Sequence, residues 1–116
     1  MSDINRMYEE AEKLKDEGRL EEATAKLEEI LQLDETHVLS HMALAMLYSK
    51  MGKYEEAVQH GERACELEPD DALNFTALSV AYQRAYAGTQ NLGFIQKAEE
   101  AMARAREIEG TPHRHH

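Results

Sequence analysis

Apolar side chains recur at three- and four-residue spacing in two consecutive stretches in the middle of the chain. The first stretch contains Leu44, Leu47, Tyr48 and Met51, and the second contains Tyr54, Ala57, Val58, Ala64 and Leu67. This spacing places the apolar groups on one face of an α-helix, so it predicts a helix on each side of a turn at residues 51–53. Gly52 suits the left-handed residue that ends a helix, and Pro69 ends the second helix. The middle of the chain is therefore predicted to be a helical hairpin.

The same pattern repeats along the chain with a period of 34 residues. Residue pairs that match at this spacing include Gly18 and Gly52, Ala23 and Ala57, and Tyr48 and Tyr82. Ala57 and Ala98 are 41 residues apart, which indicates seven inserted residues between Tyr82 and Ile95. A single hairpin of this kind cannot bury its own apolar face, so neighbouring hairpins must stack. The sequence predicts an all-α fold of six helices in three repeats, at about 4–37, 38–71 and 72–110, with the insertion near 83–94.

Composition and charge narrow the classes of function. The 116 residues include 13 Lys and Arg against 23 Asp and Glu, a formal net charge of −10. Such a chain lacks the basic face that binds nucleic acid or an anionic membrane surface. No apolar run is long enough to span a bilayer, and the chain does not begin with a signal peptide. We therefore expect a cytoplasmic protein with one domain over residues 1–110 and a flexible, histidine-containing tail at 111–116.

The repeats resemble the tetratricopeptide repeat family. The middle repeat carries the family's pattern at Leu44, Ala45, Tyr48, Gly52, Tyr54, Ala57, Ala64 and Pro69. His41 stands where the family has a large aromatic residue. The resemblance implies a right-handed α-solenoid in which the first helix of each repeat lines a concave groove for peptides or helices. It implies that the chain binds another protein, with no catalytic activity and no cofactor.

The resemblance also implies which residues line the groove. They are Tyr8, Glu12, Leu39, Met42, Met46, Lys50, Leu73, Thr76, Val80 and Arg84. The centre of the groove is then apolar, with Lys50 and Arg84 along one edge. Methionine side chains repack easily and suit an adaptable apolar contact; the alternative is that Met42 and Met46 only pack against neighbouring helices. We expect the groove to hold an apolar peptide or an amphipathic helix with an acidic flank.

One branch of the family, the carboxylate-clamp members, binds the acidic C-terminal tails of chaperones. Those members place lysine, asparagine and arginine side chains at defined groove positions. The corresponding residues here are Tyr8, Glu12, Ala43, Leu73 and Ala77. None of them is basic or carries an amide, so the sequence argues against binding of chaperone tails.

The seven-residue insertion is the most individual feature of the chain. We expect the fifth helix to run to about Ala87, followed by a loop through Gly93. Tyr86, Leu92 and Phe94 would then lie beyond the normal edge of the repeat. They are expected to pack on one another as a small cluster, or alternatively to present an aromatic contact to a partner.

The histidines and the single cysteine are the remaining candidates for chemistry. His37 and His41 are four residues apart, and His41 is expected to face His60, where Gly61 leaves room. Three imidazoles could form a zinc or nickel site, but we favour half-buried packing residues and assign no metal. No side chain is placed to activate Cys65 as a nucleophile, so we do not expect an enzyme.

Two alternatives to a groove-binding adaptor remain from the sequence. One is a histidine-based metal-binding protein, and the other is self-assembly through the end faces of the solenoid. The outer face of the third repeat carries Glu99 and Arg106 where the earlier repeats have mostly apolar residues. Because a polar end face closes a repeat array, a monomer is expected, with a weak dimer as the alternative.

Overall fold

The computed structural model describes residues 3–110, so the predicted tail at 111–116 lies outside the described residues. Six α-helices follow one another along the chain: α1 (Ile4–Asp16), α2 (Leu20–Leu33), α3 (Val38–Lys50), α4 (Tyr54–Leu67), α5 (Ala72–Thr89) and α6 (Gly93–Gly110). Over these residues no β-strand is present. The predicted all-α fold of six helices is confirmed.

Local sequence signals account for where several helices begin and end. The carboxylate of Asp3 accepts a hydrogen bond from the backbone N–H of Arg6 at the start of α1, and Asp71 accepts one from Leu73 at the start of α5. Such caps satisfy backbone donors that the first turn of a helix leaves free. Gly18 and Gly52 have φ angles of 80° and 78° in the turns after α1 and α3. Glycine adopts this left-handed conformation at little cost, which explains the first matched pair of the repeat.

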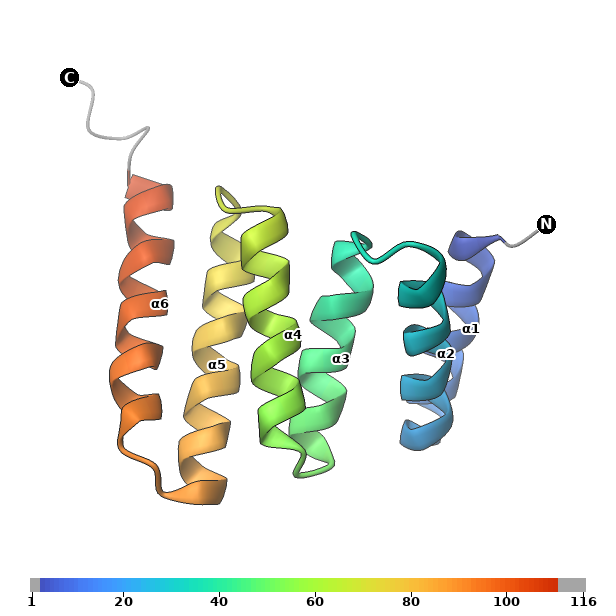
Figure 1. Cartoon of the computed structure of the whole chain (residues 1–116), viewed down its shortest axis with the longest axis horizontal. Coiled ribbons are helices and arrows are strands. Elements are labelled where there is room, and N and C mark those ends of the chain that lie inside the picture. The colour runs from blue at the N-terminus through green and yellow to red at the C-terminus, as the bar shows by residue number, and fades with distance from the viewer. Residues whose placement is uncertain (1–2, 111–116) are drawn as a thin grey trace.

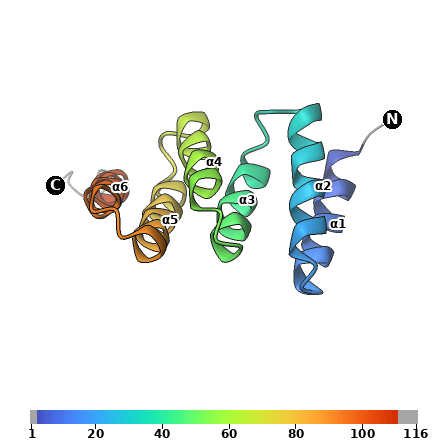
Figure 2. The ribbon, with the colours of Figure 1, turned by 60° about the horizontal axis from the view of Figure 1, so that its bottom comes forward.

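The helices stack as antiparallel pairs, and each pair packs against the next (Figure 1). In Figure 2, α3 and α5 lie on one side of the stack and α4 lies on the other. Two apolar clusters form the core. The first contains Ala11, Ala23, Leu27, Ile30, Ala43, Leu44 and Leu47, and the second contains Val58, Cys65, Leu78, Tyr82, Ala85, Ala98 and Ala101. Each cluster draws residues from two successive repeats, as expected if no repeat can bury its apolar face alone.

A tyrosine–glutamate hydrogen bond links each repeat to the one before it. The Tyr48 hydroxyl donates to a carboxylate oxygen of Glu28 over 2.7 Å, and the Tyr82 hydroxyl donates to Glu62 in the same way. The two bonds are related by the 34-residue period. Burial, reinforced by the neighbouring carboxylate, raises the pKa of both tyrosines above its ordinary value, so both remain donors at neutral pH.

The inserted residues lengthen two helices, which corrects the expected loop from Ala87 to Gly93. The period would end the fifth helix at residue 84, but α5 continues to Thr89, and α6 begins two residues earlier than its equivalent in the second repeat. The Thr89 hydroxyl bonds to the carbonyl of Ala85, and the Asn91 side chain accepts from the N–H of Gly93 over 2.9 Å. This bond to the first residue of α6 favours a helix start at Gly93, so the connection is only residues 90–92.

Gly88 shows why the longer α5 fits against its neighbour. A Cβ atom at this position would overlap the ring of Tyr54 on α4. The absence of a side chain therefore permits α5 to pass closely over Tyr54. Within the described part of the chain, no helix combines the length and the apolar character needed to cross a membrane.

Candidate functional site

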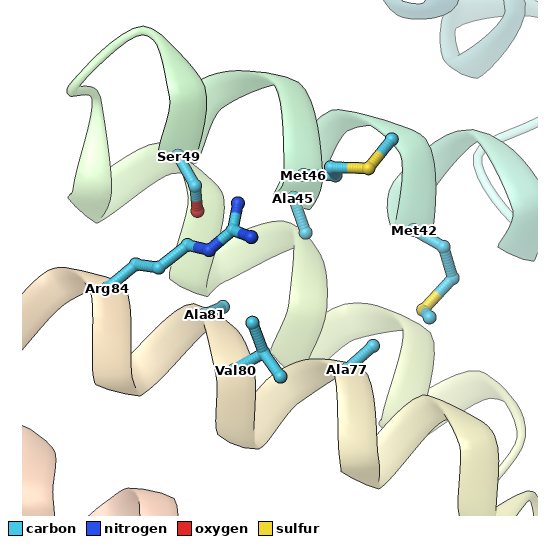
Figure 3. Close-up of a pocket in the computed structure, with 8 residues that line it drawn as sticks. All are labelled: Met42, Ala45, Met46, Ser49, Ala77, Val80, Ala81 and Arg84. Atoms are coloured by element: carbon cyan, nitrogen blue, oxygen red, sulfur yellow. The ribbon is translucent and has the colours of Figure 1, made fainter.

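A hollow lies between α3 and α5, and we call it the α3–α5 hollow. It is lined by Met42, Ala45, Met46, Ser49, Ala77, Val80, Ala81 and Arg84 (Figure 3). Met42, Met46, Val80 and Arg84 are four of the predicted groove residues, so the structure brings these four together. The hollow holds about 230 Å³, which is below the roughly 300–1,000 Å³ of typical small-molecule sites. Its size suits one or two inserted side chains better than a complete small ligand.

Small residues form much of the lining and were not among the predicted groove residues. Ala45 belongs to α3, and Ala77 and Ala81 belong to α5. Their short side chains leave space between the two helices that larger residues would fill. Alanines on two facing helices indicate such a space. Their sequence positions alone do not show that they face each other, because that depends on the register of α3 against α5.

Apolar side chains around the hollow are unusually exposed. Met46 is 39% exposed and Val80 is 38% exposed, although both belong to a wall of the hollow. Leu39 and Leu73, which occupy the same position in successive repeats, are 58% and 73% exposed and do not line the hollow itself. Burying an apolar side chain of this size contributes about 1.5–3 kcal/mol. Contact with a partner would therefore gain free energy that the free chain does not realise.

One end of the hollow is polar and has unused hydrogen-bonding capacity. Ser49 is 6% exposed, and within residues 3–110 its Oγ atom has no hydrogen-bond partner. Figure 3 shows the Arg84 guanidinium and the Ser49 hydroxyl at the same end of the hollow. In this described range neither Arg84 nor the exposed Lys50 forms a salt bridge. Because a buried hydroxyl normally has a partner, Ser49 is an exception among the buried side chains of residues 3–110.

The predicted groove residues of α1 lie apart from the α3–α5 hollow. Tyr8 is half-buried, and its ring meets that of His37 edge-on at 5.7 Å between centroids. Burial, and then the charge of Glu12, raises the pKa of Tyr8. Glu12 itself pairs with Lys15 over 3.6 Å. Of the remaining predicted groove residues, Thr76 on α5 is half-buried and does not line the hollow.

The three residues of the insertion do not pack on one another, which corrects the expected cluster. Phe94 stacks on Tyr82 with ring centroids 6.1 Å apart and packs against the second core cluster. Tyr86 is half-buried in a separate hollow between α5 and α6 that also includes Ile95. Leu92 is 70% exposed in the short connection. Because the insertion lengthens two helices, it distributes these residues over α5, the connection and α6.

The histidines occupy two different settings. His41 and His60 bond to each other through their Nδ1 atoms over 2.9 Å, whereas the Nδ1 atom of His37 bonds to the Ser40 hydroxyl. Among residues 3–110 no group of three or more histidine, cysteine, aspartate or glutamate side chains is arranged to hold a metal ion. The three histidines therefore do not form the metal site considered from the sequence. Gly61 lies against Leu78 of α5 and Ala45 of α3, so its missing side chain makes room for the close approach of α5.

Cys65 is buried, and its surroundings disfavour the thiolate. Burial, with a smaller effect of the Asp71 and Glu62 charges, raises the pKa of the Cys65 thiol to about 12. Since the thiolate is the nucleophilic form, very little of it exists at neutral pH. The geometry around Cys65 therefore gives no support to a cysteine nucleophile.

Comparison with known proteins agrees with the repeat architecture. Residues 14–79, more than half of the chain, match the family model described as "Tetratricopeptide repeat". Among solved structures, the chain is similar to one described as the crystal structure of MamA, with a TM-score of 0.80 and 16% sequence identity. That likeness covers 97% of this chain and 61% of the other.

A second solved structure, MamA residues 41 to the end from Desulfovibrio magneticus RS-1, has a TM-score of 0.74 and 23% identity. It covers 92% of this chain and 56% of the other, so the chain spans less than two thirds of either structure. No curated protein matches the chain in sequence. At these identities the likeness shows the fold, and the repeated helical hairpin is the common feature.

Proposed function

Because this chain belongs to the tetratricopeptide repeat family, a fold of protein–protein interaction modules, we propose that its α3–α5 hollow binds a segment of another protein. The observation that carries the proposal is the unpartnered Ser49 hydroxyl beside exposed apolar walls. Buried polar groups in folded proteins normally have hydrogen-bond partners, and exposed apolar side chains are normally scattered and not grouped. The α3–α5 hollow departs from both rules.

The lining of the hollow defines the chemistry of the segment that fits it. Met42, Met46 and Val80 form an apolar wall that accepts an aliphatic or aromatic side chain, and the methionines can repack around it. Arg84 and Ser49 at the polar end offer a cation and a hydroxyl. A carboxylate accepts hydrogen bonds from both, and a charge-assisted bond to arginine is among the stronger kinds. The ligand is therefore an apolar peptide or amphipathic helix that carries an aspartate or glutamate next to its apolar anchor.

Selection from a library of random displayed peptides tests this assignment without assuming any particular partner. Peptides retained by the wild-type chain should combine an apolar residue with a nearby acidic residue. An Arg84→Glu variant reverses the charge at the polar end, so it should select lysine or arginine at the same distance from the apolar anchor. Lys97→Glu makes the same charge change on α6, outside the hollow, and should leave the acidic preference unchanged.

Two results would contradict the assignment. One is that Arg84→Glu and the wild type select peptides of the same charge. The other is that Arg84→Glu and Lys97→Glu change the selection equally, because the effect would then reflect net charge alone. Self-assembly through the end faces stays a prediction, and a concentration-dependent molecular mass in solution would reveal it.

A further inference from the structure

The His41–His60 pair lies where the first repeat meets the second. His41 is on α3 and is 4% exposed, and His60 is on α4. Their Nδ1 atoms are 2.9 Å apart, and their ring centroids are 5.1 Å apart. This is a direct imidazole–imidazole hydrogen bond in the interior of the repeat.

The outer nitrogen of each ring points toward the first repeat. Nε2 of His41 is 2.8 Å from the backbone carbonyl of Glu35 and 3.4 Å from its carboxylate. Nε2 of His60 is 3.5 Å from the carboxylate of Glu28 on α2. Glu35 lies in the connection between α2 and α3, so both contacts join the pair to the first repeat. The pair is thus part of the link between the two repeats.

The third repeat has an apolar version of the same arrangement. The 34-residue period relates His41 to Phe75, and the 41-residue offset relates His60 to Ala101. Ala101 belongs to the second core cluster, and Phe75 packs against that cluster. A titratable pair is therefore not required by the repeat architecture at this position. The second repeat has two imidazoles where a phenyl ring and a methyl group serve the same packing.

The geometry limits how many protons the pair can hold. The carbonyl of Glu35 can only accept, so Nε2 of His41 carries a hydrogen. Between the two Nδ1 atoms, 2.9 Å apart, there is room for one hydrogen, donated by one ring and accepted by the other. If both imidazoles are protonated, each Nδ1 carries a hydrogen and the two donors face each other. At least one ring must then move.

We propose that the His41–His60 pair is a proton-sensitive contact that holds the first repeat against the second while the two imidazoles share a hydrogen bond, and that releases it when both are protonated. Movement of either ring displaces a nitrogen from Glu28 or Glu35. The contact of α2 with α3 loosens as a result, and the α1 part of the predicted groove, with Tyr8, separates from α3. The α3–α5 hollow lies within the second and third repeats, so this inference does not rest on the proposed function.

The surrounding charges set the direction of the response. Burial lowers the pKa of His60 most, and the neighbouring His41 lowers it further, while Glu28 and Glu56 act in the opposite sense. Arg63 is held by both carboxylate oxygens of Glu35 at 2.6 and 2.8 Å.

Tyr48 completes the surroundings of the pair, because its ring stacks against His60 at 5.8 Å. An unfolded chain binds a proton on histidine at a pKa of about 6.5, and folded His60 binds it only at lower pH. The contribution of His60 to stability therefore falls as the pH drops below about 6.5.

Hydrogen exchange of the full chain tests the proposal. Amide protection in α2, relative to protection in α6 of the same sample, should fall by up to about tenfold when the pH is lowered by one unit below the second protonation of the pair, the limit for release coupled to one proton. The matched control is His41→Phe together with His60→Ala, which copies the third repeat. In this variant the ratio of protection between α2 and α6 should stay constant over the same pH range.

Imidazole nitrogen chemical shifts of the wild type supply a measurement that needs no variant. The second protonation of the pair and the loss of α2 protection should share one midpoint. The proposal is overturned if both rings become protonated while α2 keeps its protection relative to α6. It is also overturned if the double variant loses protection as the wild type does, because glutamate protonation would then account for the change.

Discussion

Removal of the Ser49 hydroxyl should stabilise the free protein, which is the opposite of the usual effect of trimming a buried side chain. Ser49 is 6% exposed, and its Oγ atom has no partner within residues 3–110. An unsatisfied buried polar group costs about 1–3 kcal/mol. Alanine also favours a helix by up to about 0.7 kcal/mol over ordinary residues. The Ser49→Ala variant should therefore raise the free energy of unfolding by about 1 kcal/mol or more.

Ser79 provides a matched control within the same fold. It is 1% exposed on α5, and its hydroxyl donates to the carbonyl of Ala98 over 2.9 Å and accepts from the Gln83 side chain over 3.2 Å. A satisfied hydrogen bond contributes about 0.5–1.5 kcal/mol, so Ser79→Ala should leave stability unchanged or lower it. Both variants share the same gain in helix propensity, and the comparison therefore isolates the hydrogen bond.

Urea unfolding followed by far-ultraviolet circular dichroism measures both variants. The midpoint should rise for Ser49→Ala and should not rise for Ser79→Ala, with the slope unchanged in each case. The gain in stability should accompany a loss of affinity for the selected peptides if, as proposed, the ligand bonds to this hydroxyl. If Ser49→Ala destabilises the chain as much as Ser79→Ala, the Ser49 hydroxyl is satisfied in solution and the reasoning is refuted.

Three further predictions concern the packing of the repeats. Tyr82→Phe removes the hydrogen bond to Glu62 between the second and third repeats. Urea unfolding should show a free energy of unfolding lower by about 1.5–3 kcal/mol, the range for hydrogen bonds to charged groups. An unchanged free energy of unfolding would mean that water replaces this bond. Gly88→Ala should lower the thermal midpoint despite its better helix propensity, since the new methyl overlaps Tyr54, and an added Tyr54→Leu change should restore it. Alkylation of Cys65 at about pH 8 should be more than about a thousandfold slower in the folded than in the urea-unfolded chain, and equal rates would place the thiol at the surface.

The period of the sequence was sufficient to predict the six helices, because packing between repeats imposes the same residue type every 34 positions. Glycine at the turns follows that period because the turn backbone has a positive φ angle. Tyrosine on the first helix of a repeat follows it because its hydroxyl bonds to a glutamate of the preceding repeat. The partners of the tyrosines, Glu28 and Glu62, also follow it and could have been found by the same comparison. The meeting of His41 with His60 was predicted and is confirmed, with a different role for Gly61.

Features that depend on the exact helix ends, or on the register of one helix against another, could not be predicted from the sequence. The insertion was expected to form a loop from Ala87 to Gly93, but Thr89 and Asn91 bond to the local backbone and leave only three residues outside the helices. The alanine lining of the hollow and the unpartnered Ser49 hydroxyl depend on how α3 lies against α5. Neither the position of these alanines nor the missing partner of the Ser49 hydroxyl can be predicted until that register is known.

The affinity of one selected peptide for two charge variants tests the central claim most directly. Met46→Glu places a carboxylate on the apolar wall of the hollow, whereas Leu33→Glu makes the same kind of change at a leucine of α2 that is 53% exposed and does not line the hollow. Calorimetric titration should show at least about a tenfold loss of affinity for Met46→Glu, equivalent to about 1.4 kcal/mol, and no comparable loss for Leu33→Glu. Equal affinities in the two variants would contradict the assignment of the α3–α5 hollow as the binding site.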